Sequence, residues 1–278
     1  MASEKLLIIM KLSDAKCLIL CGGEGIFDTT AREYLPKCMI KIGGKPLIHH
    51  LIVYASQFGI SNFVLATGKY ENHIKSYFIN KEYYDNDIQI SFANQSITPS
   101  QNANSLKNLN IQIVSTGEDC QTGGRIARVK RFFQKEEYFL MLYSDILSSL
   151  DLNDLLSIHL KENRTITCIG VNPTSRFGIF NLSKSKITNY SIGERSNLNQ
   201  SRLNGGIFIC SSSIFDFLEP INECNLEVEV LKQLQSQQQI SLLRHDGFWH
   251  YIDTERDIKY LNELFWKNER PWLLEKKL

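Results

Sequence analysis

The chain has 278 residues, of which 43% are hydrophobic and 22% are charged, with 31 basic and 30 acidic side chains. This composition is ordinary for a globular protein and is enough for one sizeable core or two modest domains. The formal net charge of +1 excludes both the basic field that nucleic-acid binding requires and an acidic tail.

The seven cysteines are scattered along the chain, and no two of them have the spacing of a zinc site. Their odd number favours reduced thiols, so we expect a cytoplasmic protein. An apolar run at residues 6–10 is broken by Lys11 and Asp14, and it is too short for a signal peptide or a membrane span. No other segment approaches the length of a membrane span, so we expect no membrane partner.

The first part of the chain alternates short apolar runs with segments of helical periodicity. The apolar runs predict strands, and the first of them leads into a glycine loop. The predicted elements are strands at 17–20, 39–42 and 62–67, and helices at 47–58 and 71–78. Alternation of this kind predicts a parallel sheet with helices on both faces.

A polar stretch rich in Asn, Ser and Gln, residues 82–110, interrupts the alternation. It contains one predicted strand, at 88–92. A structureless loop of this length is unusual inside a compact domain, so we expect the stretch to contact a partner subunit. The later predicted elements are strands at 111–115, 138–143 and 165–171, short antiparallel strands from 177 to 210, and helices at 124–134, 152–161, 227–238 and 257–267.

The elements together predict an α/β fold with a Rossmann-like, mixed and mostly parallel sheet. The chain shows no internal repeat and no clear linker. We therefore expect one principal domain over residues 15–256. It would be preceded by an N-terminal extension, 1–14, and followed by a C-terminal helical tail, 257–278.

The glycine loop Gly22-Gly23-Glu24-Gly25 follows a predicted strand, so its backbone amides could point at phosphate groups. A tight turn without any chemistry explains the same residues equally well. Lys37 lies a short way beyond the loop and could reach a phosphate as a point charge. A solvated surface lysine is the commoner situation, so neither motif identifies a ligand by itself.

Two aspartates each follow an apolar, strand-like segment: Asp145 after residues 138–143, and Asp253 after residues 249–252. In open parallel sheets ligands gather beyond the carboxyl ends of the strands, and a carboxylate there is a natural ligand for Mg²⁺. Either aspartate could instead cap a helix or a turn. Two of them could hold one metal ion between a triphosphate and an acceptor.

The order and spacing of these motifs resemble the sugar-nucleotide pyrophosphorylases, most closely the glucose-1-phosphate cytidylyltransferases. The resemblance runs from about Ala15 to Trp272. Its elements most specific to the cytidylyl branch are Thr122-Gly123-Gly124-Arg125 and Gly247-Phe248-Trp249 with Asp253-Thr254. The other matching segments are Leu20 to Gly25, Pro36-Lys37, Ile42 to Pro46, Arg128-Val129, Tyr143 to Asp145, Arg176 to Gly178 and Asn204 to Gly206.

The resemblance implies a nucleotide-diphospho-sugar transferase fold and a nucleotidyl transfer in nucleotide-sugar and surface-polysaccharide biosynthesis. A sugar 1-phosphate would attack the α-phosphorus of CTP in line, and pyrophosphate would leave. No general base is needed because the acceptor is already an anion, so catalysis consists of positioning and charge neutralisation. The family also forms oligomers, which implies a homo-oligomer here.

The resemblance also assigns roles to residues. Lys37, Asp145 and Asp253 would be the catalytic residues, and the two aspartates would bind Mg²⁺. The implied nucleotide-binding residues are Leu20, Cys21, Gly22, Gly23, Glu24, Gly25, Lys37, Thr122 and Gly123. The implied sugar-phosphate-binding residues are Gly178, Glu194, Arg195, Asn204 and Gly205.

The donor loop departs from the family pattern Gly-x-Gly-Thr-Arg, because Ile26 and Phe27 occupy the last two positions. The family's arginine helps to neutralise the departing pyrophosphate, whereas phenylalanine has neither a charge nor a hydrogen-bond donor. Loss of such an arginine can cost about 10³-fold in rate. Arg32 lies in the same loop and could supply the missing charge.

Two hypotheses of different classes follow. In the first, the protein is a working cytidylyltransferase with a rearranged donor loop, acting on a sugar 1-phosphate or a related phosphorylated acceptor. In the second, it is a non-catalytic descendant that binds a nucleotide or a partner protein. The metal carboxylates and Lys37 favour the enzyme, because a binding protein has little need for them, and Phe27 favours the binder.

Overall fold

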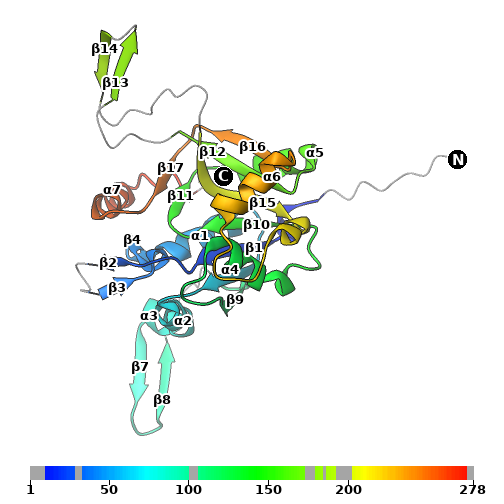
Figure 1. Ribbon diagram of the computed structural model, residues 1–278. Helices are drawn as coiled ribbons and strands as arrows, with labels where there is room; N and C mark the ends of the chain where they lie inside the picture. Colours follow the sequence, from blue (N-terminus) through cyan, green and yellow to red (C-terminus); the bar gives the residue numbers. More distant parts are fainter. Residues whose placement is uncertain are drawn as a thin grey trace, which may run out of the picture.

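The computed structural model describes residues 10–28, 33–99, 106–172, 179–183, 186–191 and 202–273. Its centre is a seven-stranded sheet in the order β16-β12-β15-β10-β1-β6-β9 (Figure 1). Within this sheet β15 runs against the other strands. The strands are β1 (Lys16–Cys21), β6 (Asn62–Thr67), β9 (Asn110–Ser115), β10 (Tyr138–Tyr143), β12 (Ile166–Val171), β15 (Leu203–Ser211) and β16 (Ile240–His245). The predicted mixed, mostly parallel sheet is confirmed.

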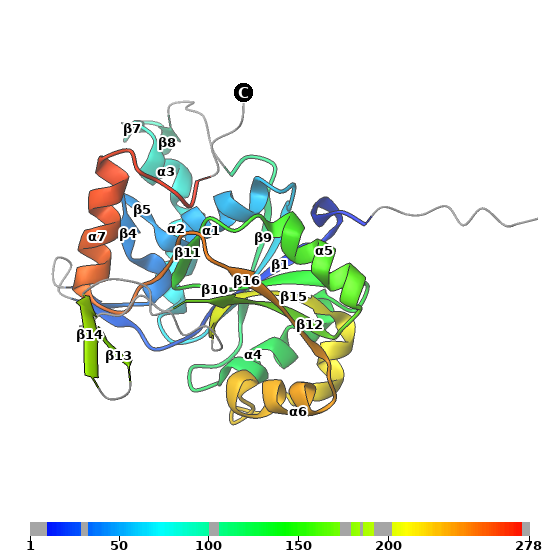
Figure 2. The ribbon, with the colours of Figure 1, turned by 90° about the horizontal axis from the view of Figure 1, so that it is seen from above.

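Side chains of β1 alternate between the two faces of the sheet, with Cys17 and Ile19 on one face and Leu18 and Leu20 on the other. Both faces are buried, so the strand is a continuous apolar run in the sequence. Helices cover both faces, as predicted (Figure 2). One face carries α1 (Leu47–Ser56) and α5 (Leu152–Glu162), and the other carries α4 (Thr122–Arg128) and α6 (Leu231–Ser236).

The predicted strand at 39–42 is wrong in its first half and confirmed in its second. The chain instead forms a 3-10 turn, η2 (Lys37–Met39), and then the two-residue strand β4 (Lys41–Ile42), which pairs with β5 (Lys45–Pro46). The reversal between β4 and β5 uses Gly43 and Gly44, whose φ angles are 59° and 82°. Glycine adopts this left-handed region without the steric cost of a Cβ atom.

The described part of the polar stretch 82–110 includes most of a short helix and a hairpin. Helix α3 (Lys81–Asp85) is followed by β7 (Ile88–Ser91) and β8 (Ser96–Pro99), which form an antiparallel pair that projects from the body (Figure 1). The sequence predicted only the first of these strands. Asp85 forms ion pairs with both Lys45 and Lys81, which anchors the base of the hairpin.

The remaining elements surround the sheet. Of the short antiparallel strands predicted from 177 to 210, β15 joins the main sheet, whereas β13 (Ile179–Ser183) and β14 (Lys186–Ser191) form a pair of their own. The other elements are η1 (Leu12–Asp14), β2 (Ile26–Asp28), β3 (Glu33–Leu35), α2 (Glu71–Ile79), η3 (Lys130–Phe132), β11 (Ile146–Ser148), η4 (Ser212–Phe217), the π-helical turn η5 (Leu226–Val230), β17 (Trp249–Tyr251) and α7 (Glu255–Trp266). No helix in the described part of the chain is long and apolar enough to cross a membrane.

Helix α7 packs back onto the body of the molecule through a third apolar cluster. Leu261 of α7 and Trp272 beyond it are fully buried there together with Ile42 and Ile252. A Thr254 cap begins the helix, with a capping box between Thr254 and Asp257. The packing of α7 therefore helps to fix the backbone of residues 252–254, which lead into the helix.

Arg125 connects three segments at the carboxyl edge of the sheet. Arg125 is only 4% exposed. Its guanidinium donates to acceptors at the end of β6 and in the loops after β1 and β9. The acceptors are Thr67 O at 3.0 Å, Thr116 Oγ1 at 2.8 Å, Gly117 O at 2.7 Å, Glu118 O at 3.0 Å and, by a short contact, Gly22 O. A planar guanidinium with several donors suits this arrangement of acceptors.

Arg125→Ala should lower the free energy of unfolding by about 3 kcal/mol or more, because each buried acceptor that loses its donor costs about 1–3 kcal/mol. Arg125→Lys should recover only part of this loss, since an ammonium lacks the planar fork. Urea denaturation measures both variants. Arg131→Ala, at an exposed position, is the control and should change stability by less than about 0.5 kcal/mol. Equal stability of Arg125→Ala and this control would contradict the role of Arg125.

Candidate active site

A cavity of about 420 Å³ lies at the carboxyl ends of β1 and β10. These strands are parallel neighbours in which Leu20 pairs with Tyr143, so the glycine loop and Asp145 lie at the same edge of the sheet. The lining residues are Leu20, Cys21, Gly22, Gly23, Glu24, Gly25, Pro36, Lys37, Cys120, Gln121, Thr122, Arg125, Tyr143, Ser144, Asp145 and Asp253.

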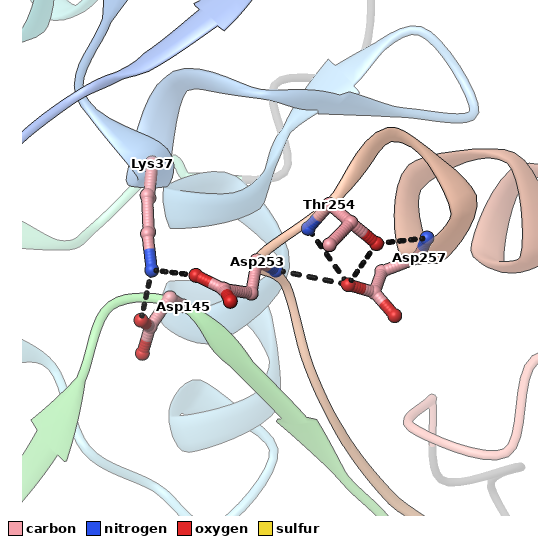
Figure 3. Close-up of polar contacts among 5 residues, drawn as sticks. All are labelled: Lys37, Asp145, Asp253, Thr254 and Asp257. Atoms are coloured by element: carbon pink, nitrogen blue, oxygen red, sulfur yellow. Dashed lines mark hydrogen bonds and ion pairs between the residues drawn. The ribbon is translucent and has the colours of Figure 1, made fainter. Parts of the chain in front are cut away.

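Lys37 lies between the two aspartates that the sequence singled out (Figure 3). Its Nζ atom is 3.4 Å from Asp145 Oδ2 and 3.0 Å from Asp253 Oδ1. Residues that are 108 and 216 positions away from Lys37 thus meet it at one point. Asp253 does not cap the following helix, because the side chain of Thr254 has that role.

A short antiparallel pair brings the two aspartates together. Strand β11 follows Asp145 directly, strand β17 precedes Asp253, and Ile146 pairs with Tyr251. The backbone N–H of Ile252 donates to the carbonyl of Asp145 at 2.8 Å. Strand β11 was not predicted, because a three-residue strand is too short to show a period.

Burial and charge act in opposite directions on these groups. Burial lowers the pKa of Lys37, but the carboxylates of Asp145 and Asp253 outweigh it and raise the pKa above its ordinary value. Burial raises the pKa of Asp145, although the Lys37 ammonium opposes the shift. The pairing is consistent with a site that concentrates negative charge around a cation.

Asp145 and Asp253 are able to hold a divalent cation. They already converge on one cation, the Lys37 ammonium, and oxygen donors are the ligands that Mg²⁺ prefers. The described residues contain no group of three or more His, Cys, Asp or Glu side chains suited to a metal. Mg²⁺ is commonly bound by one or two carboxylates together with substrate phosphates, so a two-carboxylate set fits it.

Glu227 is a site residue that sequence reasoning missed. One of its carboxylate oxygens accepts from Thr122 Oγ1 at 2.6 Å, and the other accepts a short hydrogen bond from Tyr143 Oη. Thr122 and Tyr143 both line the cavity, so Glu227 connects two of its walls. In the sequence Glu227 is only an acidic residue at the start of a predicted helix, a common feature that does not mark a site.

Gly123 is the one predicted nucleotide-binding residue that does not line the cavity. It is buried, and a Cβ atom at this position would lie 2.6 Å from Cys224 Sγ. At the neighbouring Gly124 a Cβ atom would lie 2.1 Å from the carbonyl oxygen of Ile221. The two glycines therefore allow α4 to pack closely against residues 221–224.

The predicted sugar-phosphate residues are only partly placed. Asn204 and Gly205 lie at the start of β15, outside the lining of the cavity, and Gly205 O accepts from Trp249 Nε1 at 2.8 Å. This bond gives a physical reason for the tryptophan of the Gly-Phe-Trp element. Gly178, Glu194, Arg195 and the loop residue Arg32 lie outside the described residues.

Phe27 lies in a short hairpin beside the cavity, in which β2 pairs with β3. The Phe27 ring packs edge-on against Tyr34 with ring centroids 5.3 Å apart, and the two residues are 45% and 56% exposed. The described residues that line the cavity include two cationic side chains, Lys37 and Arg125. Arg125 is committed to the surrounding loops, which leaves Lys37 as the cation beside the carboxylates.

Comparison with known proteins agrees with this geometry. The chain is 29% identical to a probable glucose-1-phosphate cytidylyltransferase of Bacillus subtilis (strain 168), over 92% of this chain and 98% of that protein. It is 30% identical to the glucose-1-phosphate cytidylyltransferase of Salmonella typhi, with the same coverage. Both relatives are named as sugar-phosphate nucleotidyltransferases, the class of enzyme that the sequence predicted.

The fold has counterparts among solved structures. A putative glucose-1-phosphate thymidylyltransferase from Bacillus anthracis superposes with a TM-score of 0.64 at 15% identity, over 94% of this chain and 98% of that one. The model of the family described as "Nucleotidyl transferase" matches residues 16–259. The resemblance read from the sequence motifs is confirmed, and the chain belongs to the nucleotidyl transferase family.

Proposed function

We propose that the protein transfers a cytidylyl group from CTP to a sugar 1-phosphate with the help of Mg²⁺. The observation that carries the proposal is the convergence of Lys37, Asp145 and Asp253 beside the glycine loop. A protein that only bound a nucleotide would have no need to bring two carboxylates from distant segments onto one cation. The names of the two relatives support CTP as the donor and glucose 1-phosphate as the first acceptor to test.

The reaction is an in-line displacement at phosphorus. A bond forms between an acceptor phosphate oxygen and the α-phosphorus of CTP, and the bond from that phosphorus to the bridging oxygen of pyrophosphate breaks. Mg²⁺ held by Asp145 and Asp253 would neutralise phosphate charge. Lys37 adds a point charge next to the carboxylates, and the amides of Gly22 and Gly23 can donate to phosphate oxygens. The chain's contribution is positioning and electrostatics.

The proposal predicts pyrophosphate release with CTP and a sugar 1-phosphate. A screen of the four nucleoside triphosphates against a panel of sugar 1-phosphates with Mg²⁺ should give the highest turnover for CTP. Asp145→Asn and Asp253→Asn should each lower kcat by about 10²-fold or more, because a catalytic metal is worth several kcal/mol. Asp154→Asn, on the exposed side of α5, is the control and should leave kcat unchanged. Nucleotide binding without any pyrophosphate release would instead support a non-catalytic descendant.

Phe27 in the donor loop, at the position of the family's arginine, predicts an enzyme with a reduced kcat. Phe27→Arg should raise kcat by up to about 10³-fold, because an arginine there stabilises charge on the leaving pyrophosphate. The gain should appear in kcat more than in the KM of the acceptor. Phe27→Leu is the control, since it removes the contact with Tyr34 without adding charge.

The same measurement tests the compensating role of Arg32. If Arg32 supplies the missing charge, Arg32→Ala should abolish turnover, and adding Phe27→Arg should restore part of it. Full wild-type turnover in the Arg32→Ala variant would refute that role. Lys37 or a residue of another subunit would then be the source of the charge.

We also propose a homo-oligomer in which the β7–β8 hairpin contacts a neighbouring subunit. Ile90 pairs with Ile97 across the hairpin, Ile88 lies on the same face, and these residues are 46–53% exposed. Side chains two positions apart on a strand share a face, so the three isoleucines form an uncovered apolar strip. Phe92, at the turn, is 89% exposed.

Light scattering at micromolar concentration should therefore detect an oligomer. The double variant Ile90→Lys and Ile97→Lys should shift it to monomer, because two charges would have to be buried in the contact. Leu242→Lys, on the sheet-edge strand β16 and 46% exposed, is a matched control that should leave the assembly intact. A wild-type monomer would contradict this proposal and leave the proposed chemistry untouched.

A further inference from the structure

Asp257 is a buried carboxylate in the first turn of α7, where the residue is only 5% exposed. Its Oδ2 atom accepts from the backbone N–H of Asp253 at 3.1 Å, the backbone N–H of Thr254 at 2.8 Å and the hydroxyl of Thr254 at 2.8 Å (Figure 3). Its Oδ1 atom lies 3.2 Å from His250 Nε2. Several hydrogen bonds are needed to offset the cost of burying a carboxylate.

Capping of the helix accounts for only some of these bonds. A capping box consists of the bonds that Thr254 and Asp257 exchange, and it serves the stability of α7. The bond from the N–H of Asp253 lies one residue outside the box. This bond holds the backbone N–H of Asp253, the residue whose carboxylate contacts Lys37.

The contact with His250 extends the same connection to β17. His250 pairs with Leu147 of β11, the strand that begins immediately after Asp145. The Asp257 carboxylate therefore contacts the strand that leads into Asp253 and the backbone of Asp253 itself. Both contacts fix the segment 250–254 relative to Asp145.

The side chain of Asp253 has little packing of its own, because it is 51% exposed. Its direction therefore depends on the backbone that carries it. Supporting hydrogen bonds around metal ligands typically change metal affinity or activity by about 10–100-fold when they are removed. The Asp253 carboxylate contacts Lys37 directly, whereas the backbone that carries it is held by the bond from its N–H to Asp257.

We propose that Asp257 is a positioning residue that orients the Asp253 carboxylate so that it shares a divalent cation with Asp145. Asp257 itself does not touch substrate or metal. The inference rests on the proposed function, because it assumes that the two aspartates bind Mg²⁺. It assigns to α7 a part in metal binding that is separate from its contribution to the core.

The test is a titration of the full chain with Mn²⁺, as a spectroscopic substitute for Mg²⁺, in the presence of CTP. Electron paramagnetic resonance measures free Mn²⁺, so the readout does not depend on turnover. Asp257→Ala should raise the half-saturating Mn²⁺ concentration by about 10–100-fold. Asp257→Asn should stay within about threefold of wild type, because its amide oxygen can still accept from the N–H groups of Asp253 and Thr254.

A control separates positioning from loss of a helix cap. Asp151 caps α5 by accepting from the N–H of Asn153 at 2.8 Å, and it does not line the cavity. Asp151→Ala should cost about 1 kcal/mol of stability, as cap removal usually does, without changing the Mn²⁺ titration. If Asp257→Ala does not fold, Asp257→Glu takes its place: glutamate suits a capping box, but its longer side chain moves the oxygens away from the N–H of Asp253.

The outcomes are distinguishable. Wild-type chain that binds no Mn²⁺ with CTP and releases no pyrophosphate would refute the proposed function, and the inference with it. If the wild type binds Mn²⁺ and Asp257→Ala or Asp257→Glu has the same titration as Asp151→Ala, Asp257 only caps the helix and the inference is overturned. A raised half-saturation in the Asp257→Ala or Asp257→Glu variant, with rescue by Asp257→Asn, supports it.

Discussion

The guanidinium of Arg125 is the interaction on which the architecture of the site most depends. The end of β6 and the loops after β1 and β9 present backbone or hydroxyl oxygens at the carboxyl edge of the sheet. One buried cation with a planar set of donors satisfies them together. The bond to Gly22 O ties the glycine loop, which lines the cavity, to the other two segments.

The second requirement is to bring two carboxylates from distant segments to one point. The parallel pairing of β1 with β10 places Asp145 beside the glycine loop, and the β11–β17 pair carries Asp253 to the same place. Like charges at short range repel unless a cation lies between them. In this protein the Lys37 ammonium has that position, and the same negative field would attract a divalent ion that arrives with a triphosphate.

The departure in the donor loop lies in one structural unit. The hairpin formed by β2 and β3 exposes an aromatic pair where the family's loop carries an arginine. Lys37, Asp145 and Asp253 lie together at the cavity beside the glycine loop. The aromatic pair and these three charged side chains therefore belong to different segments of the chain.

The sequence by itself determined the central strands, because a strand that is buried on both faces is a continuous apolar run. The segments 62–67 and 138–143 were predicted with the bounds that β6 and β10 have. It also singled out Asp145 and Asp253 by their positions after apolar segments and Lys37 by the resemblance, and the structure brings the three together. Short or polar elements, such as β8 and β11, gave too little periodicity to be seen.

Only the tertiary structure decided which residues of a motif line or support the cavity and which allow two segments to pack closely. Gly123 belongs to the same element as Thr122, yet it makes room for Cys224, whereas Thr122 lines the cavity. Glu227 and Asp257 are ordinary first-turn acids in the sequence, and their roles come from partners far away in the chain or just outside the helix. A hydrogen bond joins atoms that are close in space, and the sequence order of one helix does not specify which distant segment will approach it.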